Sequence, residues 1–154
     1  MKNRNPKYFL GVDGGGTHCR VRLTNADGII IGENFAGPAN TTNGVTQAFH
    51  SILDATDLIL NEHNLTPSIL SETYAGLGLA GIIDTVEINK VEQHEHPFAK
   101  VTADSDAAIA CLGAHNGEDG GIAVFGTGSN CFAYFKGKRI SVGGWGFILS
   151  DHGS

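Results

Sequence analysis

The sequence has 154 residues, and ten Lys and Arg against sixteen Asp and Glu give it a formal charge of −6. Hydrophobic residues make up 41% and charged residues 17%, which indicates a folded globular chain and excludes a disordered one. The acidic balance argues against a surface that binds nucleic acid or anionic membranes. Glycine is enriched, with 22 residues in clusters rather than at a fixed period.

The cysteines and the N-terminal region indicate a cytoplasmic protein. Cys19, Cys111 and Cys131 are widely spaced and fit neither a disulfide framework nor a Cys-x-x-Cys metal site. We expect them to be small, buried and reduced. The apolar run at residues 8–12 ends at Asp13 and is too short for a secretion signal or a membrane span.

The first third of the chain predicts three strands. Residues 8–12 form an apolar run, and residues 18–24 alternate between polar and apolar, which is the pattern of a half-buried strand. A turn signal at residues 25–28 precedes a third strand over 29–35. The first two strands are joined by the loop Asp13-Gly14-Gly15-Gly16-Thr17, so the chain opens with an antiparallel meander whose first hairpin is rich in glycine.

The middle of the chain alternates helices and strands. Apolar residues recur every three or four positions from Val45 to Leu60, which predicts a helix that Thr42 or Asn43 caps and that ends near Asn64. A strand, a helix, a strand and an Ala-rich helix then follow over residues 73–80, 82–93, 98–103 and 107–115. Three further strands, over residues 121–125, 131–135 and 139–142, surround a second glycine loop, Gly126-Thr127-Gly128-Ser129.

Both glycine loops are candidates for binding phosphate, because glycine lets backbone N–H groups approach phosphate oxygens. The dinucleotide-binding and protein-kinase glycine patterns fail at Cys19, and the Walker pattern fails because Thr17 stands where Lys is required. What remains is a glycine loop at the tip of a hairpin, preceded by an acid. Two tight hairpins that need glycine for a positive φ are the simpler alternative, but two such loops in one chain favour phosphate binding.

Several sequence blocks in a fixed order resemble one family. They are residues 9–17, 37–40, 76–81, 96–99, 104–108, 126–130, 143–146 and 151–154. The chain resembles the first lobe of the actin/hexokinase-type ATPase fold and, more narrowly, the BadF/BadG-type N-acetylglucosamine and glucosamine kinases. The resemblance implies an α/β fold, an actin-like ATPase (ribonuclease H-like) lobe with a mixed central sheet and flanking helices. Residues 1–117 would form this lobe, and residues 118–154 the second glycine hairpin and the start of the segment leading to a second lobe absent from this chain.

The resemblance also implies the ligands and the site. ATP and Mg²⁺ are the expected cofactors, and the substrate is an amino sugar phosphorylated at its 6-hydroxyl. Asp13 would bind Mg²⁺, directly or through water, and Asp106 would be the catalytic base, with Asp104 as the competing candidate. The residues expected to bind the nucleotide phosphates are Asp13, Gly14, Gly15, Gly16, Thr17, Gly126, Thr127 and Gly128. Those expected to bind the sugar are Asn40, Ser129, Asn130, Gly144, Trp145, Gly146 and Asp151.

Some of these residues have simpler interpretations. Asp106 lies in the first turn of a predicted helix, where a carboxylate commonly caps the helix. Trp145 is equally compatible with a core anchor. The stretch His94-Glu95-His96 is better explained as a solvated loop than as a metal site, since no set of four ligands with fixed spacing accompanies it.

Three functions remain open from the sequence. The first is an amino-sugar kinase, with the missing lobe and a homodimer of the full-length protein as further partners. The second is a nucleotide-gated switch of the BadF type without a sugar substrate. The third is a sugar-binding regulator, which we expect to carry a helix-turn-helix before the first strand. Two motifs point to different sugars. The N-acetylglucosamine kinases differ at Asp151-His152-Gly153-Ser154 but are similar at Gly144-Trp145-Gly146. The substituent on the sugar C2 therefore stays open.

Overall fold

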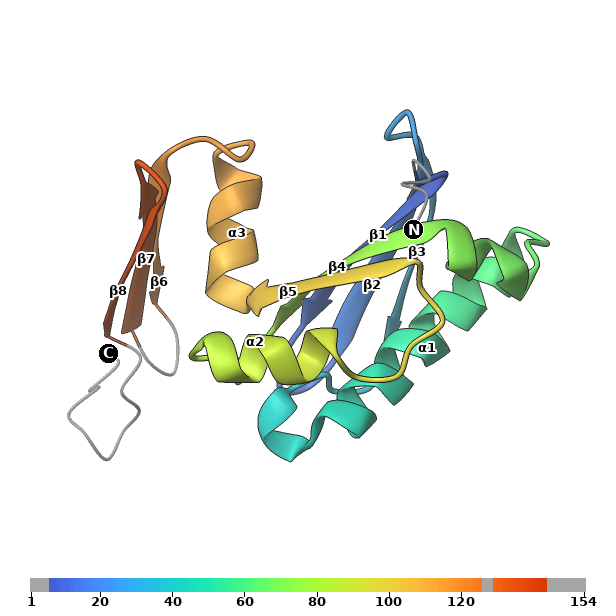
Figure 1. Ribbon diagram of the computed structural model, residues 1–154, viewed down its shortest axis with the longest axis horizontal. Coiled ribbons are helices and arrows are strands. Elements are labelled where there is room, and N and C mark those ends of the chain that lie inside the picture. The colour runs from blue at the N-terminus through green and yellow to red at the C-terminus, as the bar shows by residue number, and fades with distance from the viewer. Residues whose placement is uncertain (1–5, 126–128, 144–154) are drawn as a thin grey trace. The chain divides into compact units, whose positions relative to one another are not determined.

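The computed structural model describes residues 6–125 and 129–143, and the chain divides into two compact units after Asp106 (Figure 1). The first unit is an α/β layer structure built on a five-stranded sheet. The second contains one helix and a three-stranded antiparallel sheet. Each unit is described by itself below.

The first unit contains the mixed sheet that the sequence predicts. Its strands lie in the order β3-β2-β1-β4-β5. β2 pairs antiparallel with β1 and β3, whereas β4 runs parallel to β1 and β5 runs parallel to β4. The strands are β1 (Tyr8–Gly14), β2 (Cys19–Asn25), β3 (Ile30–Ala36), β4 (Thr73–Leu79) and β5 (Lys100–Ser105). A mixed central sheet with helices packed against it is the arrangement that the sequence predicts, so the predicted fold class is confirmed.

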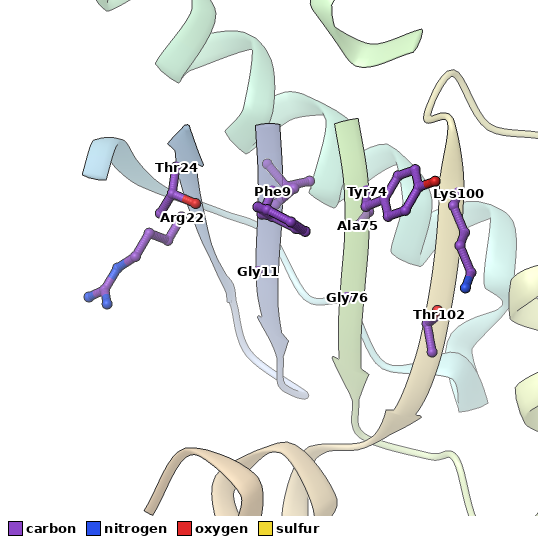
Figure 2. Close-up of a pocket in the computed structure, with 10 residues that line it drawn as sticks. Phe9, Gly11, Arg22, Thr24, Tyr74, Ala75, Gly76, Lys100 and Thr102 are labelled. Carbon is purple, nitrogen blue, oxygen red and sulfur yellow. The ribbon is translucent and has the colours of Figure 1, made fainter. Parts of the chain in front are cut away.

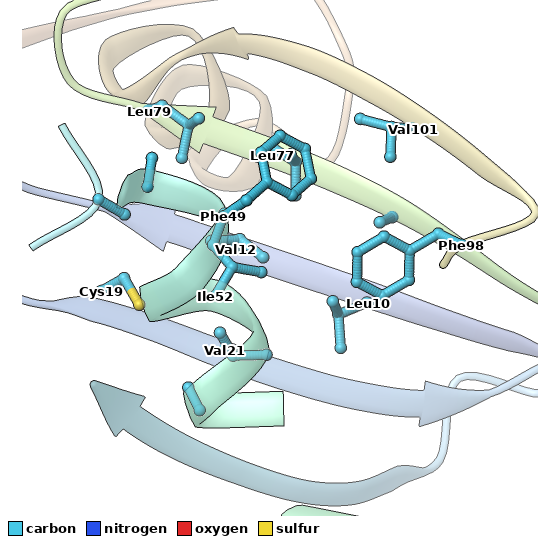
Figure 3. Close-up of a cluster of buried hydrophobic side chains, with 14 of the residues drawn as sticks. Leu10, Val12, Cys19, Val21, Phe49, Ile52, Leu77, Leu79, Phe98 and Val101 are labelled. Carbon is cyan, nitrogen blue, oxygen red and sulfur yellow. The ribbon is translucent and has the colours of Figure 1, made fainter. Parts of the chain in front are cut away.

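One face of this sheet is covered by two helices. α1 (Val45–Glu62) contacts β1, β2 and β3, while α2 (Thr85–Glu92) contacts β5. The core between the layers contains alternate residues of β1, such as Leu10 and Val12, together with Phe49 and Ile52 of α1 (Figure 3). Each such side chain contributes about 2 kcal/mol through apolar burial. The core therefore holds the strands that carry the first glycine loop.

The helix boundaries differ from the sequence prediction in two places. The predicted caps Thr42 and Asn43 are wrong, because they lie in a short 3-10 helix (Thr41–Asn43) and α1 begins after Gly44 without a side-chain cap. The second helix starts later than predicted, because the Asp84 carboxylate accepts hydrogen bonds from the N–H groups of Val86 and Glu87 and caps it there. A second 3-10 helix (Pro67–Glu72), absent from the prediction, leads into β4.

The second unit contains α3 (Asp106–Ala114), whose first residue ends the first unit, and the strands β6 (Gly120–Phe125), β7 (Ser129–Phe135) and β8 (Lys138–Gly143). The three strands form an antiparallel meander in that order. Its small core contains Ala107, Ala108, Cys111 and Phe132. The predicted strand–loop–strand–turn–strand arrangement is therefore confirmed, although residues 126–128 of the loop lie outside the described residues.

No helix within the described ranges is both long and apolar enough to cross a membrane.

Candidate functional site

The candidate site lies at the edge of the first sheet where the parallel strands β1, β4 and β5 end. In α/β folds, ligands bind at this carboxyl edge because the connecting loops meet there. Three segments leave the edge: residues 14–17 after β1, Ala80 and Gly81 after β4, and Asp106 after β5. The topology thus places the first glycine loop and the predicted base at the same edge of one sheet.

Backbone hydrogen bonds join the glycine loop to two neighbouring loops. The N–H of Ala80 donates to the carbonyl of Gly14 at 2.7 Å, and the N–H of Ala39 donates to that of Gly15 at 3.0 Å. The N–H of Thr41 in turn donates to the carbonyl of Ala80 at 2.9 Å. Three segments far apart in the sequence therefore fix one another's backbone, which keeps the loop in place without a ligand.

Two glycines at this junction are required by close packing. A Cβ on Gly14 would lie 2.5 Å from Cδ2 of Leu79 and 2.9 Å from the carbonyl oxygen of Ala39. Gly81 has a φ of +92°, and a Cβ there would lie 2.6 Å from Oδ1 of Asn40. Only glycine fits either position without moving backbone atoms.

The tip of the glycine loop is available to a ligand. The N–H of Gly15 closes the hairpin by donating to the carbonyl of His18 at 3.0 Å. The N–H groups of Gly16 and Thr17 make no hydrogen bond within the described chain. A cavity of about 320 Å³ opens beside them, lined by Asp13, Gly15, Gly16, Thr17, His18, Arg20 and Phe35. Free amides, a hydroxyl and a guanidinium at one cavity form a set of donors that suits phosphate oxygens.

Two carboxylates share the open face of the sheet beside this cavity. Asp13 pairs in register with Gly78, and Gly78 pairs in register with Asp104. Asp13 and Asp104 therefore lie on one face, two strand spacings or about 10 Å apart, with only a glycine between them. The described residues contain no group of three or more His, Cys, Asp or Glu that could form a metal cage. One or two carboxylates beside a phosphate loop are what Mg²⁺ requires, because it keeps several waters and shares its ligands with phosphates.

The sugar-binding candidates are only partly described. Asn40 lies at the junction of the loops, where its Oδ1 accepts hydrogen bonds from the N–H and hydroxyl of Thr42 at 2.9 and 2.7 Å. Its amide oxygen thus caps the first 3-10 helix. Asn130 lies in β7 of the second unit, and its Oδ1 accepts a bond from the Ser141 hydroxyl at 3.4 Å. Ser129 begins β7, while the other sugar-binding candidates, Gly144, Trp145, Gly146 and Asp151, lie outside the described residues. The same holds for the phosphate-binding candidates Gly126, Thr127 and Gly128.

The predicted base and its competitor differ in their position on the backbone. Asp106 is exposed and is the first residue of α3, immediately after β5. Asp104 is half-buried within β5, and one carboxylate oxygen accepts the Ser105 N–H at 2.7 Å. Both roles stay predictions.

Sequence analysis did not single out three residues that line the loop cavity: His18, Arg20 and Phe35. The sequence contains a signal for two of them. His18 and Arg20 are polar and flank the buried Cys19, so the strand alternation places them on the opposite face from it. Arg20 pairs in register with Asp13 and so shares its face. Phe35 lines the cavity because β3 pairs with β2 and places Phe35 beside Arg20. The sequence alone does not determine this register.

A larger cavity, of about 450 Å³, lies on the same open face but nearer the starts of β1, β4 and β5 (Figure 2). Aromatic residues Phe9 and Tyr74 and the glycines Gly11 and Gly76 line it, together with Arg22 and Lys100. None of the predicted site residues that the structure describes lines it. Its size therefore does not identify it as the place of the chemistry, which we assign to the loop edge by topology and hydrogen-bond donors.

Comparisons with known proteins show which proteins this chain is similar to. The chain is 42% identical over 147 residues to the glucosamine kinase GspK of Vibrio cholerae, covering 96% of this chain and 50% of that protein. It is 31% identical over 153 residues to an N-acetylmuramic acid/N-acetylglucosamine kinase of Clostridium acetobutylicum, covering 96% and 49% of the two chains. A solved structure assigned as an N-acetylglucosamine kinase of Chromobacterium violaceum superposes with a TM-score of 0.87 at 31% identity, over 96% of this chain and 52% of that one. The chain thus spans about half the length of the curated relatives it matches.

The mixed sheet in the order β3-β2-β1-β4-β5, with a glycine loop after β1, defines the class as actin-like ATPase folds. Within that class, the model of the BadF/BadG/BcrA/BcrD ATPase family matches residues 10–154, and the chain belongs to this family.

Proposed function

We propose that the chain is the N-terminal half of an ATP-dependent amino-sugar kinase that phosphorylates the 6-hydroxyl of glucosamine or N-acetylglucosamine. The observation that carries the proposal is the 42% identity to a glucosamine kinase over 96% of the chain. The higher identity to that relative than to the 31% identical N-acetylmuramic acid/N-acetylglucosamine kinase makes glucosamine the first substrate to test. In the full polypeptide, the second lobe would correspond to the half of these relatives that this chain does not match.

In this proposal the loop edge holds the nucleotide. The N–H groups of Gly16 and Thr17 and the Thr17 hydroxyl would donate to phosphate oxygens, and the second glycine loop, at residues 126–128, would do the same. Asp13 would hold Mg²⁺, and Mg²⁺ when bound would neutralise phosphate charge. Phosphoryl transfer depends mainly on such positioning and charge stabilisation.

The Asp106 carboxylate would accept the proton of the sugar 6-hydroxyl as its oxygen bonds to the γ-phosphorus. The bond between the γ-phosphorus and the β–γ bridging oxygen breaks, and ADP leaves. Because the transition state is loose, a carboxylate of ordinary basicity is sufficient. Asn40, Ser129, Asn130, Asp151 and the backbone around Trp145 would orient the sugar.

ADP release by the full polypeptide, meaning this chain with its second lobe, tests the proposal. Mg-ATP would be supplied with glucosamine, N-acetylglucosamine, glucose or no sugar. We expect release that requires one amino sugar, and an Asp106→Asn variant slowed by about 10²-fold or more. Asp104→Asn is run beside it, because Asp104 is the competing candidate for the base. Release without sugar would replace the kinase by a nucleotide-gated switch, and a collapse in Asp104→Asn alone would move the base to Asp104.

A further inference from the structure

Glu33 of β3 joins two arginines on the open face of the sheet. Its Oε1 accepts hydrogen bonds from Nε and a terminal guanidinium nitrogen of Arg20 at 2.8 and 2.7 Å. Its Oε2 accepts the matching pair from Arg22 at 2.7 and 2.6 Å. Each arginine thus presents two donors to one carboxylate oxygen, a geometry that fixes the direction of both guanidinium groups.

Arg20 has a second carboxylate within reach. It pairs in register with Asp13 across the β1–β2 ladder, and directly opposed residues of an antiparallel pair have Cβ atoms about 5 Å apart. Yet the guanidinium lies toward β3, on Glu33 and 5.9 Å from the centre of the Phe35 ring. Arg20 and Phe35 both line the phosphate-loop cavity, of about 320 Å³.

The direction of Arg20 decides whether the Asp13 carboxylate is ion-paired or available to a metal ion. An arginine paired with Asp13 would occupy the oxygens that a Mg²⁺ ion or its water shell needs. It would also offset the negative charge that attracts the ion. An arginine turned toward Glu33 leaves Asp13 available and keeps its own outer donors on the cavity wall.

We propose that Glu33 is a positioning residue that holds the Arg20 guanidinium on the wall of the phosphate-loop cavity and away from Asp13. The proposal rests on the proposed use of Mg²⁺ and a nucleotide at this loop. Glu33 itself touches neither group. It acts through Arg20, whose position favours nucleotide phosphates, and through the carboxylate that Arg20 then leaves available to the metal.

The proposal is tested without turnover by measuring ADP binding to the full polypeptide. Calorimetry gives the binding at a series of Mg²⁺ concentrations. In Glu33→Gln the released Arg20 pairs with Asp13, and we expect the Mg²⁺ concentration for half-maximal binding to rise about fivefold, the scale of one exposed ion pair. In Arg20→Gln we expect ADP affinity to fall about tenfold, through a lost charged phosphate contact, with an unchanged Mg²⁺ midpoint.

The double variant Glu33→Gln/Arg20→Gln separates positioning from a structural effect. With no arginine to compete for Asp13, its Mg²⁺ midpoint returns to the value of the parent protein. ADP concentrations are scaled to the affinity of each variant so that midpoints are comparable. A double variant that keeps the raised midpoint of Glu33→Gln would overturn the proposal, as would a Glu33→Gln variant identical to the parent.

Glu87→Gln is the matched control. Its carboxylate pairs with Nζ of Lys90 at 2.7 Å on α2, outside both the loop cavity and the open face. We therefore expect this variant to leave the Mg²⁺ midpoint unchanged. A crystal structure of metal-free Glu33→Gln adds a direct readout, since Arg20 should then contact Asp13. ADP release without sugar would remove the amino-sugar function but not this proposal, whereas an absence of Mg²⁺-dependent ADP binding in the parent would overturn both.

Discussion

At the scale of single residues, Gly14 is a position where one added carbon meets closely packed neighbours, backbone among them. Gly14→Ala places a Cβ 2.5 Å from Leu79 and 2.9 Å from the carbonyl of Ala39, so backbone has to move. We expect a loss of about 2 kcal/mol in the free energy of unfolding, the usual scale of overpacking. Urea denaturation of the 154-residue chain measures it.

Gly11→Ala is its control, because it lies on the same strand and no atom is within 4 Å of its added Cβ. A stability change below about 0.5 kcal/mol is expected there. Equal losses in the two variants would contradict the close-packing argument and point to a general intolerance of β1 to alanine.

Glu33 predicts a dependence of stability on pH. Hydrogen bonds from Arg20 and Arg22 lower the pKa of Glu33 from its ordinary value of 4.5. The unfolded chain therefore binds this proton at a higher pH than the folded chain, so its contribution is complete above pH 4.5 and is lost as the pH falls through the lower folded pKa. The stability difference between parent and Glu33→Gln should shrink on acidification. Urea titrations at several pH values between about 3 and 6 measure it, and a constant difference would contradict it.

The glycine loop and Asp13 could be predicted from the sequence, because an acid followed by glycines between two strand patterns is a local signal. The ion-paired Glu33 could not, because its partners depend on the register of β3 against β2. That register shifts between Leu23 and Thr24 and follows a turn at Gly28, whose φ is +79°. A shift of one residue would turn Glu33 to the other face.

At the scale of elements, α2 contributes a side chain to the edge strand β5. Oε1 of Glu92 accepts the Ala103 N–H at 2.9 Å, at the side of β5 that has no strand neighbour among the described residues. Glu92→Ala leaves this partly buried N–H without its acceptor, and we expect a loss of about 1–2 kcal/mol and faster amide exchange at Ala103. Glu87→Ala on the same helix removes only an exposed ion pair with Lys90 and should cost less than about 0.5 kcal/mol. Equal losses would show that this bond is not responsible for the loss in Glu92→Ala.

The elements themselves were largely predictable, since apolar alternation marked the strands and a three- and four-residue period marked α1. The start of α1 was not. Gly44 precedes it with a φ of +110°, and the two side chains expected to cap it, Thr42 and Asn43, belong to a 3-10 helix capped by Asn40. A 3-10 helix followed directly by an α-helix contains the polar capping residues that sequence analysis assigns to a single helix start.

At the scale of the whole molecule, the two units differ in how much apolar surface they bury. Among the described residues, 21 hydrophobic side chains form the core of the first unit, against four in the second. Regions with few buried contacts open at lower free energy. In native-state hydrogen exchange of this chain, we therefore expect β6–β8 amides to exchange well before those of β1 and β4. Equal protection of both sheets would contradict this expectation.

The direction of β1 has a practical consequence for experiments at surfaces. β1 starts at Tyr8 and reaches the loop edge at Gly14, so the beginning of the strand lies about 20 Å from that edge. A sensor chip or affinity tag attached upstream of Tyr8 is joined to the strand end that is remote from the glycine loop. Immobilisation through the N-terminus should therefore leave the loop edge facing solution and accessible to small ligands.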